Sequence, residues 1–151
     1  MTQVKDLMTE VVETLEPGDT LADAERLMRL GAIRHLPVVD GGERLLGLLS
    51  HRGILTAWVS HGSPDREQPG AVASEIPVEM VMETRVLTIS PHTAAAEAAR
   101  IMETRRIGCL PVIERGKLVG IITEGDFLRF ARRHFDIEDS EDHAWDAETS
   151  G

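Results

Sequence analysis

The sequence contains the same segment twice, and this internal repeat constrains the fold more than any other feature. Residues 78–128 repeat residues 4–55 at an offset of 74, until one residue is dropped in the turn at 40–43. In this register Leu-Pro-Val-Val at 36–39 aligns with Leu-Pro-Val-Ile at 110–113. A self-match of this length predicts two similar halves that pack about a pseudo-twofold axis, with two related clefts between them. Differences between the halves therefore indicate where function lies.

Each half is predicted to fold as strand, helix, strand, strand and helix (βαββα), which places the protein in the α/β class. In the first half a short extended stretch at residues 11–15 ends at a Pro-Gly pair, and apolar residues then recur at helical spacing over 21–28. Asp19 stands where an N-cap is expected, and Gly31 stands where this helix should end. The second half repeats the pattern, with a helix predicted behind Thr93.

The two remaining strands of each half are predicted to form a hairpin. Residues 36–39 and 45–49 are rich in Leu and Val and flank a turn with two glycines, and residues 110–113 and 118–122 are their counterparts. Each hairpin has a proline near its start, where a missing N–H donor is tolerated. A helix with apolar residues at i, i+1 and i+4 is expected to close each half.

The chain has room for one domain built from two halves. Its 151 residues divide into a first repeat at 4–59, a linker at 60–74, a second repeat at 75–134 and an acidic tail at 135–151, which is predicted to be disordered. A half of about fifty residues would bury too little apolar surface to be stable alone. The hydrophobic fraction of 42% is mostly aliphatic and suffices for a core that the halves share.

Charge and aromatic content argue against nucleic-acid binding. The formal net charge is −10, and residues 136–151 contribute seven acids and no Lys or Arg. The rest of the chain holds 19 acidic and 16 basic residues, so no basic stripe opposes the acidic tail. Three Phe, two Trp and no Tyr leave too few rings for a platform that stacks bases.

Cysteine usage and hydropathy predict a cytoplasmic protein. The single cysteine, Cys109, excludes an internal disulfide and fits a reducing compartment. It lies among apolar residues, which favours an inert buried thiol. No apolar run reaches the roughly 18 residues that a membrane span needs. The N-terminal residues lack the pattern of a signal peptide.

The paired motifs resemble those of the CBS-domain family. Each half runs Met-x-x-x-Val-x-x-Leu/Ile-x-Pro, then a helix, then Leu-Pro-Val-hydrophobic, then Gly-hydrophobic-hydrophobic-Ser/Thr, and the match covers about residues 4–134. Such a tandem pair is often called a Bateman module. The resemblance implies a regulatory module without catalysis of its own, whose clefts bind adenine nucleotides or other adenosine-containing ligands. It also implies a flat, disc-shaped dimer that is held together by helices.

The second half carries the ligand signature of this family in full, from Gly120 to Asp126. Thr123 precedes a helix, so its hydroxyl and the free N–H groups beyond it can receive a phosphate. Asp126 lies one turn into the helix, and its carboxylate can accept both hydroxyls of a ribose. The same Thr-x-x-Asp spacing also forms a capping box, and the two roles can coexist. By resemblance, the adenine would lie against apolar residues of the cleft: Val11, Val12, Cys109 and Ile121.

The first half departs from this signature at one decisive position. Ser50 keeps the hydroxyl, but Gly53 stands where the second half has its aspartate, so this cleft lacks the ribose acceptor. Arg34 and His35 replace an uncharged aligned pair, and in some relatives basic residues at this position contact phosphates. Ser50, Arg34, His35 and Arg52 therefore form a candidate second anion site. The alternative is that these cations are simply solvated at the rim of the cleft.

Neither a metal site nor a catalytic centre is expected, and no cofactor is required. His35, His51 and Cys109 are of types that bind zinc, but no short ligand spacing joins them. The sequence has no dinucleotide fingerprint, P-loop, metalloprotease motif or hydrolase elbow. The chain is therefore predicted not to be an enzyme.

Two functions from different classes follow. The first is ligand sensing by a stand-alone repeat pair that binds AMP, ADP, ATP, NAD or S-adenosylmethionine, with AMP and ATP as the leading candidates. Occupancy would shift the geometry of a homodimer or of a regulated protein that the sequence does not identify. The second is a structural dimer module without a physiological ligand. Either way, apolar residues of the closing helices are expected at a homodimer interface: Trp58, Phe127 and Phe130.

Overall fold

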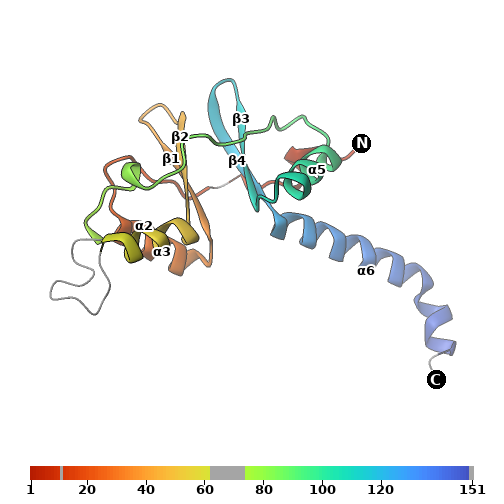
Figure 1. Ribbon diagram of the computed structural model, residues 1–151. Helices are drawn as coiled ribbons and strands as arrows, with labels where there is room; N and C mark the ends of the chain where they lie inside the picture. The colour runs from red at the N-terminus through yellow and green to blue at the C-terminus, as the bar shows by residue number, and fades with distance from the viewer. Residues whose placement is uncertain (11, 62–73, 150–151) are drawn as a thin grey trace.

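The computed structural model describes residues 1–10, 12–61 and 74–149, and their side chains up to residue 137 except that of residue 61. Two similar halves lie side by side, each with a two-stranded sheet and helices packed against it (Figure 1). In chain order the elements are α1 (Val4–Leu7), α2 (Leu21–Gly31), β1 (His35–Val39), β2 (Leu45–Ser50), α3 (His51–His61), η1 (Val78–Met80), α5 (Ala95–Arg105), β3 (Cys109–Glu114), β4 (Lys117–Thr123) and α6 (Glu124–Thr149).

The predicted α/β class and both predicted hairpins are confirmed. Strands β1 and β2 pair antiparallel, as do β3 and β4, and each sheet has a register irregularity at the same place in the repeat. The strand expected at the start of each half is reduced to an isolated parallel bridge, Leu15 with Val38 and Ile89 with Val112. A proline follows two residues after each bridge, and its missing N–H ends the pairing.

The start of the first repeat packs into the core of the second. Val4 donates its backbone N–H to the carbonyl of Thr93 at 2.8 Å, and Thr9 and Ile121 exchange two backbone hydrogen bonds of 2.9 and 3.1 Å. The Val4 side chain is fully buried in the second core. In Figure 1, α1 accordingly lies beside α5, away from the other helices of its own repeat.

The start of the second repeat packs into the first in the equivalent way. Val78 donates to the carbonyl of Asp19 at 2.7 Å, and Leu48 and Glu83 exchange two hydrogen bonds of 2.9 Å. Val78 is fully buried in the first core. Each half therefore completes the core of the other, as expected for repeats too small to be stable alone.

Two glycines make this exchange of segments feasible. A Cβ atom at Gly47 would lie 2.5 Å from the Met82 sulfur and 2.8 Å from the Glu83 carbonyl oxygen. At the aligned Gly120 it would lie 2.7 Å from the Met8 sulfur and 2.9 Å from the carbonyl oxygen of residue 9. The glycine of the repeated Gly-hydrophobic-hydrophobic motif is thus required by the close approach of the opposite segment.

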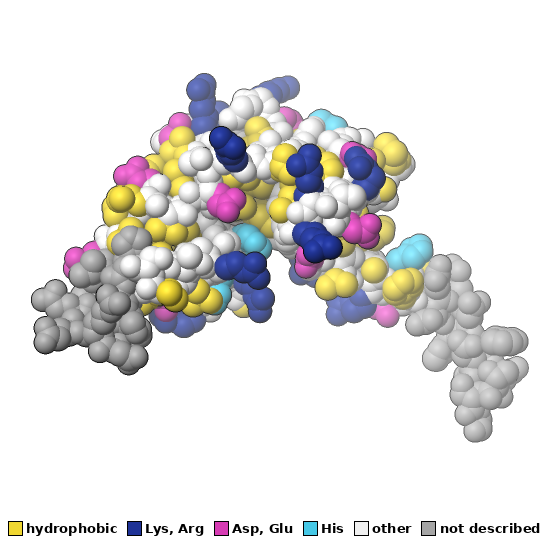
Figure 2. Space-filling view, in the orientation of Figure 1, with side chains coloured by type: hydrophobic (Ala, Val, Ile, Leu, Met, Phe, Trp, Pro, Cys, Tyr) yellow, Lys and Arg dark blue, Asp and Glu magenta, His cyan; other side chains and the backbone are white. Residues whose placement is uncertain are grey.

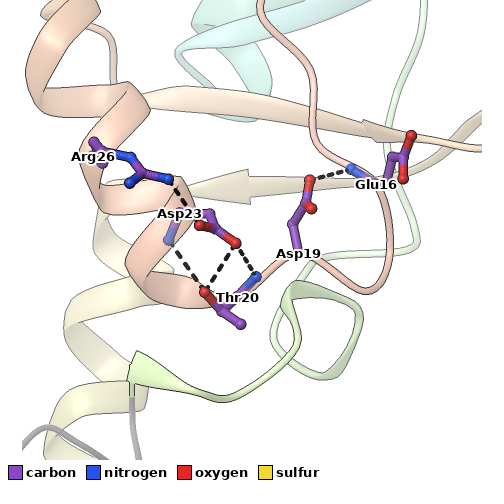
Figure 3. Close-up of polar contacts among 5 residues, drawn as sticks. All are labelled: Glu16, Asp19, Thr20, Asp23 and Arg26. Atoms are coloured by element: carbon purple, nitrogen blue, oxygen red, sulfur yellow. Dashed lines mark hydrogen bonds and ion pairs between the residues drawn. The ribbon is translucent and has the colours of Figure 1, made fainter.

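The N-cap of α2 is Thr20, so the prediction of Asp19 is wrong by one residue (Figure 3). Thr20 and Asp23 form a capping box, in which Asp23 accepts the Thr20 N–H at 3.0 Å. Asp19 instead accepts the Glu16 N–H at 2.8 Å and closes the preceding turn. In the second half the cap position falls to Ala94, one residue after Thr93, and no side chain caps α5.

Helix α6 continues to Thr149, further than the closing helix expected from the sequence. The chain from Asp126 to Ser150 contains neither Gly nor Pro, so nothing local stops the helix. The side chains of residues 138–149, among them Trp145, lie outside the described part, as do the linker residues 62–73. Within the described residues, none of the helices combines the length and apolar character that crossing a bilayer requires.

Candidate functional site

A hollow of about 600 Å³ opens where the turn into α3 faces the start of the second repeat. Its walls are residues 34–35 and parts of 48–55 from the first repeat, and 83–87 and 106–109 from the second. The volume falls within the range of small-molecule sites, about 300–1,000 Å³. In Figure 2, His side chains and dark blue Lys or Arg side chains border the recess between the two halves.

The lining of this hollow is strongly cationic. Arg34, Arg52, Arg85 and Arg106 all contribute, and Glu83 is its acidic member. In the part of the chain that the structure describes, none of these four guanidinium groups forms an ion pair. His35 and His51 add two imidazole rings to this lining. The hollow is therefore a region of positive potential on a chain with a formal charge of −10.

The start of α3 holds the polar groups of the first repeat in place. The Ser50 hydroxyl accepts the Gly53 N–H at 3.0 Å, so it caps the helix. The His51 N–H donates to the Arg34 carbonyl at 2.8 Å and ties the loop that carries Arg34 and His35 to the helix start. The N-terminus of α3, the Ser50 hydroxyl and the arginines therefore lie around the same hollow.

Burial controls the two titratable groups on the inner wall. It lowers the pKa of His35 below the usual value; the carboxylate of Glu124 acts in the opposite direction, and the charge of Arg34 lowers the pKa further. Burial also raises the pKa of the Cys109 thiol to about 12, so this group stays protonated. The predicted burial of Cys109 is confirmed, and its chemistry is that of a small apolar side chain.

The start of α6, which is the counterpart of the start of α3 in the second repeat, holds Asp126, whose carboxylate already has a full set of partners. One oxygen accepts the Thr123 N–H at 2.8 Å and the Thr123 hydroxyl at 3.3 Å. The other accepts the Thr9 hydroxyl at 3.4 Å and a hydrogen bond from Arg129. The capping interaction anticipated from the Thr-x-x-Asp spacing is therefore present. Neither Asp126 nor Thr123 borders the cationic hollow.

Helix α2 supplies an internal reference for this arrangement. The Asp23 carboxylate accepts hydrogen bonds from Thr20 and Arg26 (Figure 3), at the same spacing as the Asp126 carboxylate accepts them from Thr123 and Arg129. The two differ in burial, since the Asp23 side chain is 40% exposed and that of Asp126 only 2%. They also differ in their neighbours, because the Thr9 hydroxyl reaches Asp126 from the other repeat. Capping alone does not require that burial.

The structure brings the residues predicted for the anion site into one place and divides those predicted for the adenosine site. Ser50, Arg34, His35 and Arg52 all line the hollow. Cys109 borders the same hollow, although it was expected beside Asp126. The rest of the predicted lining lies elsewhere: Ile121 is buried opposite Thr9, Val12 is half-buried, and Val11 lies outside the described residues.

Sequence reasoning missed Arg85 and Arg106, which complete the cationic wall. Arg85 aligns with Val11 at the offset of 74. Residues 11 and 12 are expected in the lining of one cleft. By the pseudo-twofold symmetry, their counterparts 85 and 86 are then expected in the lining of the other. Arg106 aligns with Ala32 and precedes the loop that matches residues 33–35. No local signal identifies it, because only the packing across the seam brings it to the hollow.

The residues considered for a metal site do not form one within the described structure. His35, His51 and Cys109 all border the hollow, yet no three His, Cys, Asp or Glu residues there are grouped so that they could hold an ion. A smaller hollow of about 350 Å³ lies between the two hairpins, near Leu46, Val86 and Ile113. Its only charged wall residue is Arg44, so it offers little for recognition.

Comparison with known proteins is consistent with this architecture. A model of the CBS domain matches residues 4–60 and 74–133. The CBS domain-containing protein YhcV of Bacillus subtilis is 32% identical over 126 residues, which cover 83% of each chain. A crystal structure of a Vibrio cholerae protein named for acetoin utilization (AcuB) superposes with a TM-score of 0.81 at 38% identity, over 93% of this chain and 97% of that one. CBSX2, solved in complex with AMP, gives a TM-score of 0.74 at 25% identity, over 88% and 98% of the two chains.

Proposed function

The chain belongs to the CBS-domain family, and on that basis we propose that it is a regulatory module that senses an adenosine-containing ligand in the clefts between its repeats. AMP and ATP are the candidate ligands. The observation that carries the proposal is the burial of Asp126 at the seam, where an equivalent helix cap elsewhere in the chain is exposed. The complex of CBSX2 with AMP, formed by a relative of the same fold, supports the choice of ligand class.

Binding at Asp126 requires one local rearrangement. Arg129 now occupies the oxygen that faces away from Thr123, and its side chain is 54% exposed. The Arg129 side chain can swing into solvent, and a ribose hydroxyl that takes its place keeps the buried carboxylate hydrogen-bonded, which offsets the cost of breaking the ion pair. A ribose hydroxyl can then donate to the carboxylate in place of the guanidinium. Thr123 and the N-terminus of α6 would hold a phosphate beyond the ribose.

Calorimetry with AMP tests this assignment. Asp126→Asn keeps the shape and one acceptor of the helix cap but removes the charge, and hydrogen bonds to a charged acceptor contribute roughly 1.5–3 kcal/mol. We expect AMP affinity to fall about ten- to a hundredfold. Asp23→Asn, in the matching cap of α2, is the control and should bind as the wild type does. Unchanged affinity in Asp126→Asn would contradict the assignment.

A thermal-shift screen separates ligand sensing from the structural alternative. Adenosine, AMP, ADP, ATP, NAD and S-adenosylmethionine would each be added at millimolar concentration. A ligand at a hundred times its dissociation constant stabilises the fold by about 2.7 kcal/mol, which is readily seen as a shift in melting temperature. If no member of the series shifts the transition, the chain is a structural or interaction module.

We also propose that the module acts as a homodimer through α3 and α6. Of the three aromatic residues expected at this interface, Trp58 and Phe127 instead pack against the two cores, and Phe130 is exposed. Further exposed apolar residues of these helices extend the surface: Leu55, Val59, Leu128, Phe135 and Ile137. Light scattering should give twice the chain mass, and Leu128→Glu should yield a monomer. A monomeric wild type at micromolar concentration would contradict the proposal.

A further inference from the structure

The four arginines of the hollow have no counterpart in the other cleft. At the aligned positions the second cleft has only uncharged residues: Gly108 for Arg34, Gly125 for Arg52, Val11 for Arg85 and Ala32 for Arg106. The second repeat therefore forms the same fold without any of these charges. The fold therefore does not need the four guanidinium groups.

The four arginines also repel one another electrostatically when the hollow holds no anion. Four like charges border one space; among the described lining residues the acid is Glu83, and Glu124 lies beside the wall at His35. None of the four is neutralised by an ion pair within the described residues. Each guanidinium lowers the free energy of an anion in the hollow and raises that of a cation. The arrangement is suited to a ligand that brings several negative charges.

We propose that the hollow selects a small polyphosphate, with two or more linked phosphates, over monophosphates and over cationic adenosine ligands such as S-adenosylmethionine. This deepens the proposed function and rests on it for the assignment of the clefts as ligand sites. Guanidinium groups bind phosphate oxygens with two parallel hydrogen bonds, so four of them suit a phosphate chain. The Ser50 hydroxyl and the N-terminus of α3 offer further donors to the same groups.

The arginines come from both repeats, and this suggests how a ligand in the hollow could regulate the protein. Arg34 and Arg52 belong to the first repeat, and Arg85 and Arg106 belong to the second. A phosphate chain in the hollow contacts both pairs, so it draws the two halves together across the seam. An occupied hollow therefore favours one relative placement of the repeats, which is the change that a partner protein would detect.

Calorimetry of the full chain at about 150 mM salt tests the inference with three probes: inorganic tripolyphosphate, ATP and AMP. The variants are Arg85→Gln and Arg106→Gln. Arg105→Gln is the matched control, because Arg105 is exposed beside Arg106 but does not line the hollow. We expect tripolyphosphate or ATP to bind at least tenfold more tightly than AMP. Each hollow variant should lose about tenfold in that affinity, and the control should lose none.

The probes distinguish the source of the phosphates. Tripolyphosphate binding as tight as that of ATP assigns the site to the phosphate chain alone, and this holds even if adenosine ligands fail to bind at Asp126. Tight binding of ATP without binding of tripolyphosphate assigns it to a nucleoside polyphosphate. Equal affinities for AMP and ATP that Arg85→Gln lowers equally, the absence of binding by both polyphosphates, or equal losses in the Arg105→Gln control would overturn the inference.

Discussion

The two clefts of this protein share one frame and differ in charge. In each, a segment from the opposite repeat crosses a glycine of the second hairpin strand, Gly47 or Gly120, and a hydroxyl residue starts the closing helix. The first cleft adds four arginines and lacks a carboxylate at the third helix position. The second has Asp126 there and no arginine at the four aligned positions.

This difference indicates that the charged positions, rather than the shared apolar and glycine positions, would determine which ligand each cleft binds. The apolar and glycine positions are duplicated because both clefts need the same backbone approach. The charged positions diverge because they contact solvent or a ligand, and the fold tolerates either set. Ligand choice can therefore change in one cleft while the other, and the core between them, stay as they are.

The largest expected effect concerns the shared frame. Gly47→Ala and Gly120→Ala both place a Cβ within 3 Å of the crossing segment, so the backbone must shift. Each should lower the free energy of unfolding by about 1–3 kcal/mol, as overpacked sites do. Gly41→Ala is the control, because a Cβ there meets nothing within 4 Å. Urea denaturation measures all three, and a large loss at only one of the two cleft glycines would break the equivalence of the frames.

The next effect concerns the third position of each closing helix. Asp126→Ala removes the acceptor of the Thr123 N–H and should lower the free energy of unfolding by about 1–2 kcal/mol. Gly53→Ala should change stability by less than about 0.5 kcal/mol. Its Cβ would lie 3.3 Å from the Ser50 hydroxyl and in ordinary contact, at 3.9 Å, with Leu49 and Val81, while alanine favours the helix. Equal losses in the two variants would show that the clefts do not differ here in the way we describe.

A smaller effect is expected at the entrance to the second cleft. Arg129→Ala removes one of the two donors to the outer oxygen of Asp126, so AMP no longer has to displace the guanidinium. We expect affinity to rise about two- to fivefold, because AMP no longer competes with the guanidinium for the carboxylate. Calorimetry on the variant decides the matter. A clear loss of affinity would mean that Arg129 contacts the ligand rather than guards the site.

The smallest effect is the pH dependence that His35 gives to the first cleft. Its pKa is lowered in the folded state, chiefly by burial, so the unfolded chain takes up a proton more readily than the folded one does. Stability is therefore retained above about pH 6.5 and declines as the pH falls through that value. His35→Gln should flatten the slope of unfolding free energy between pH 7 and 5.5. An unaltered slope would remove His35 from the account.

The affinity for a polyanion should depend on pH in the opposite direction from the folding stability. Negative charge in the hollow favours the protonated imidazole, so tripolyphosphate should bind more tightly as the pH falls from 7 to 6. Because His51 borders the same hollow, the comparison needs His51→Gln as a second variant. Affinity that is independent of pH in the wild type would argue that the phosphates lie away from this wall.

The sequence was sufficient for the repeats, the hairpins and the approximate helices, because each depends on local periodicity. The cap of α2 was misplaced because Asp19 and Thr20 are both good caps, and a competing turn takes the Asp19 carboxylate. The residues predicted for an anion site, Ser50 and its neighbours, do line one hollow, because they lie close together in the chain or in paired strands. Arg85 could have been found from the repeat register, as the counterpart of Val11, whereas Arg106 was missed because only long-range packing across the seam brings it to the hollow.

The central claim is that the two clefts bind different chemical groups, and calorimetry with two simple probes tests it most directly. The full chain is titrated with adenosine, which carries ribose and no phosphate, first alone and then with saturating inorganic tripolyphosphate. Our account predicts one adenosine site per chain, with an affinity that tripolyphosphate changes by less than about threefold. Two equal adenosine sites per chain, or competition that abolishes adenosine binding, would contradict it.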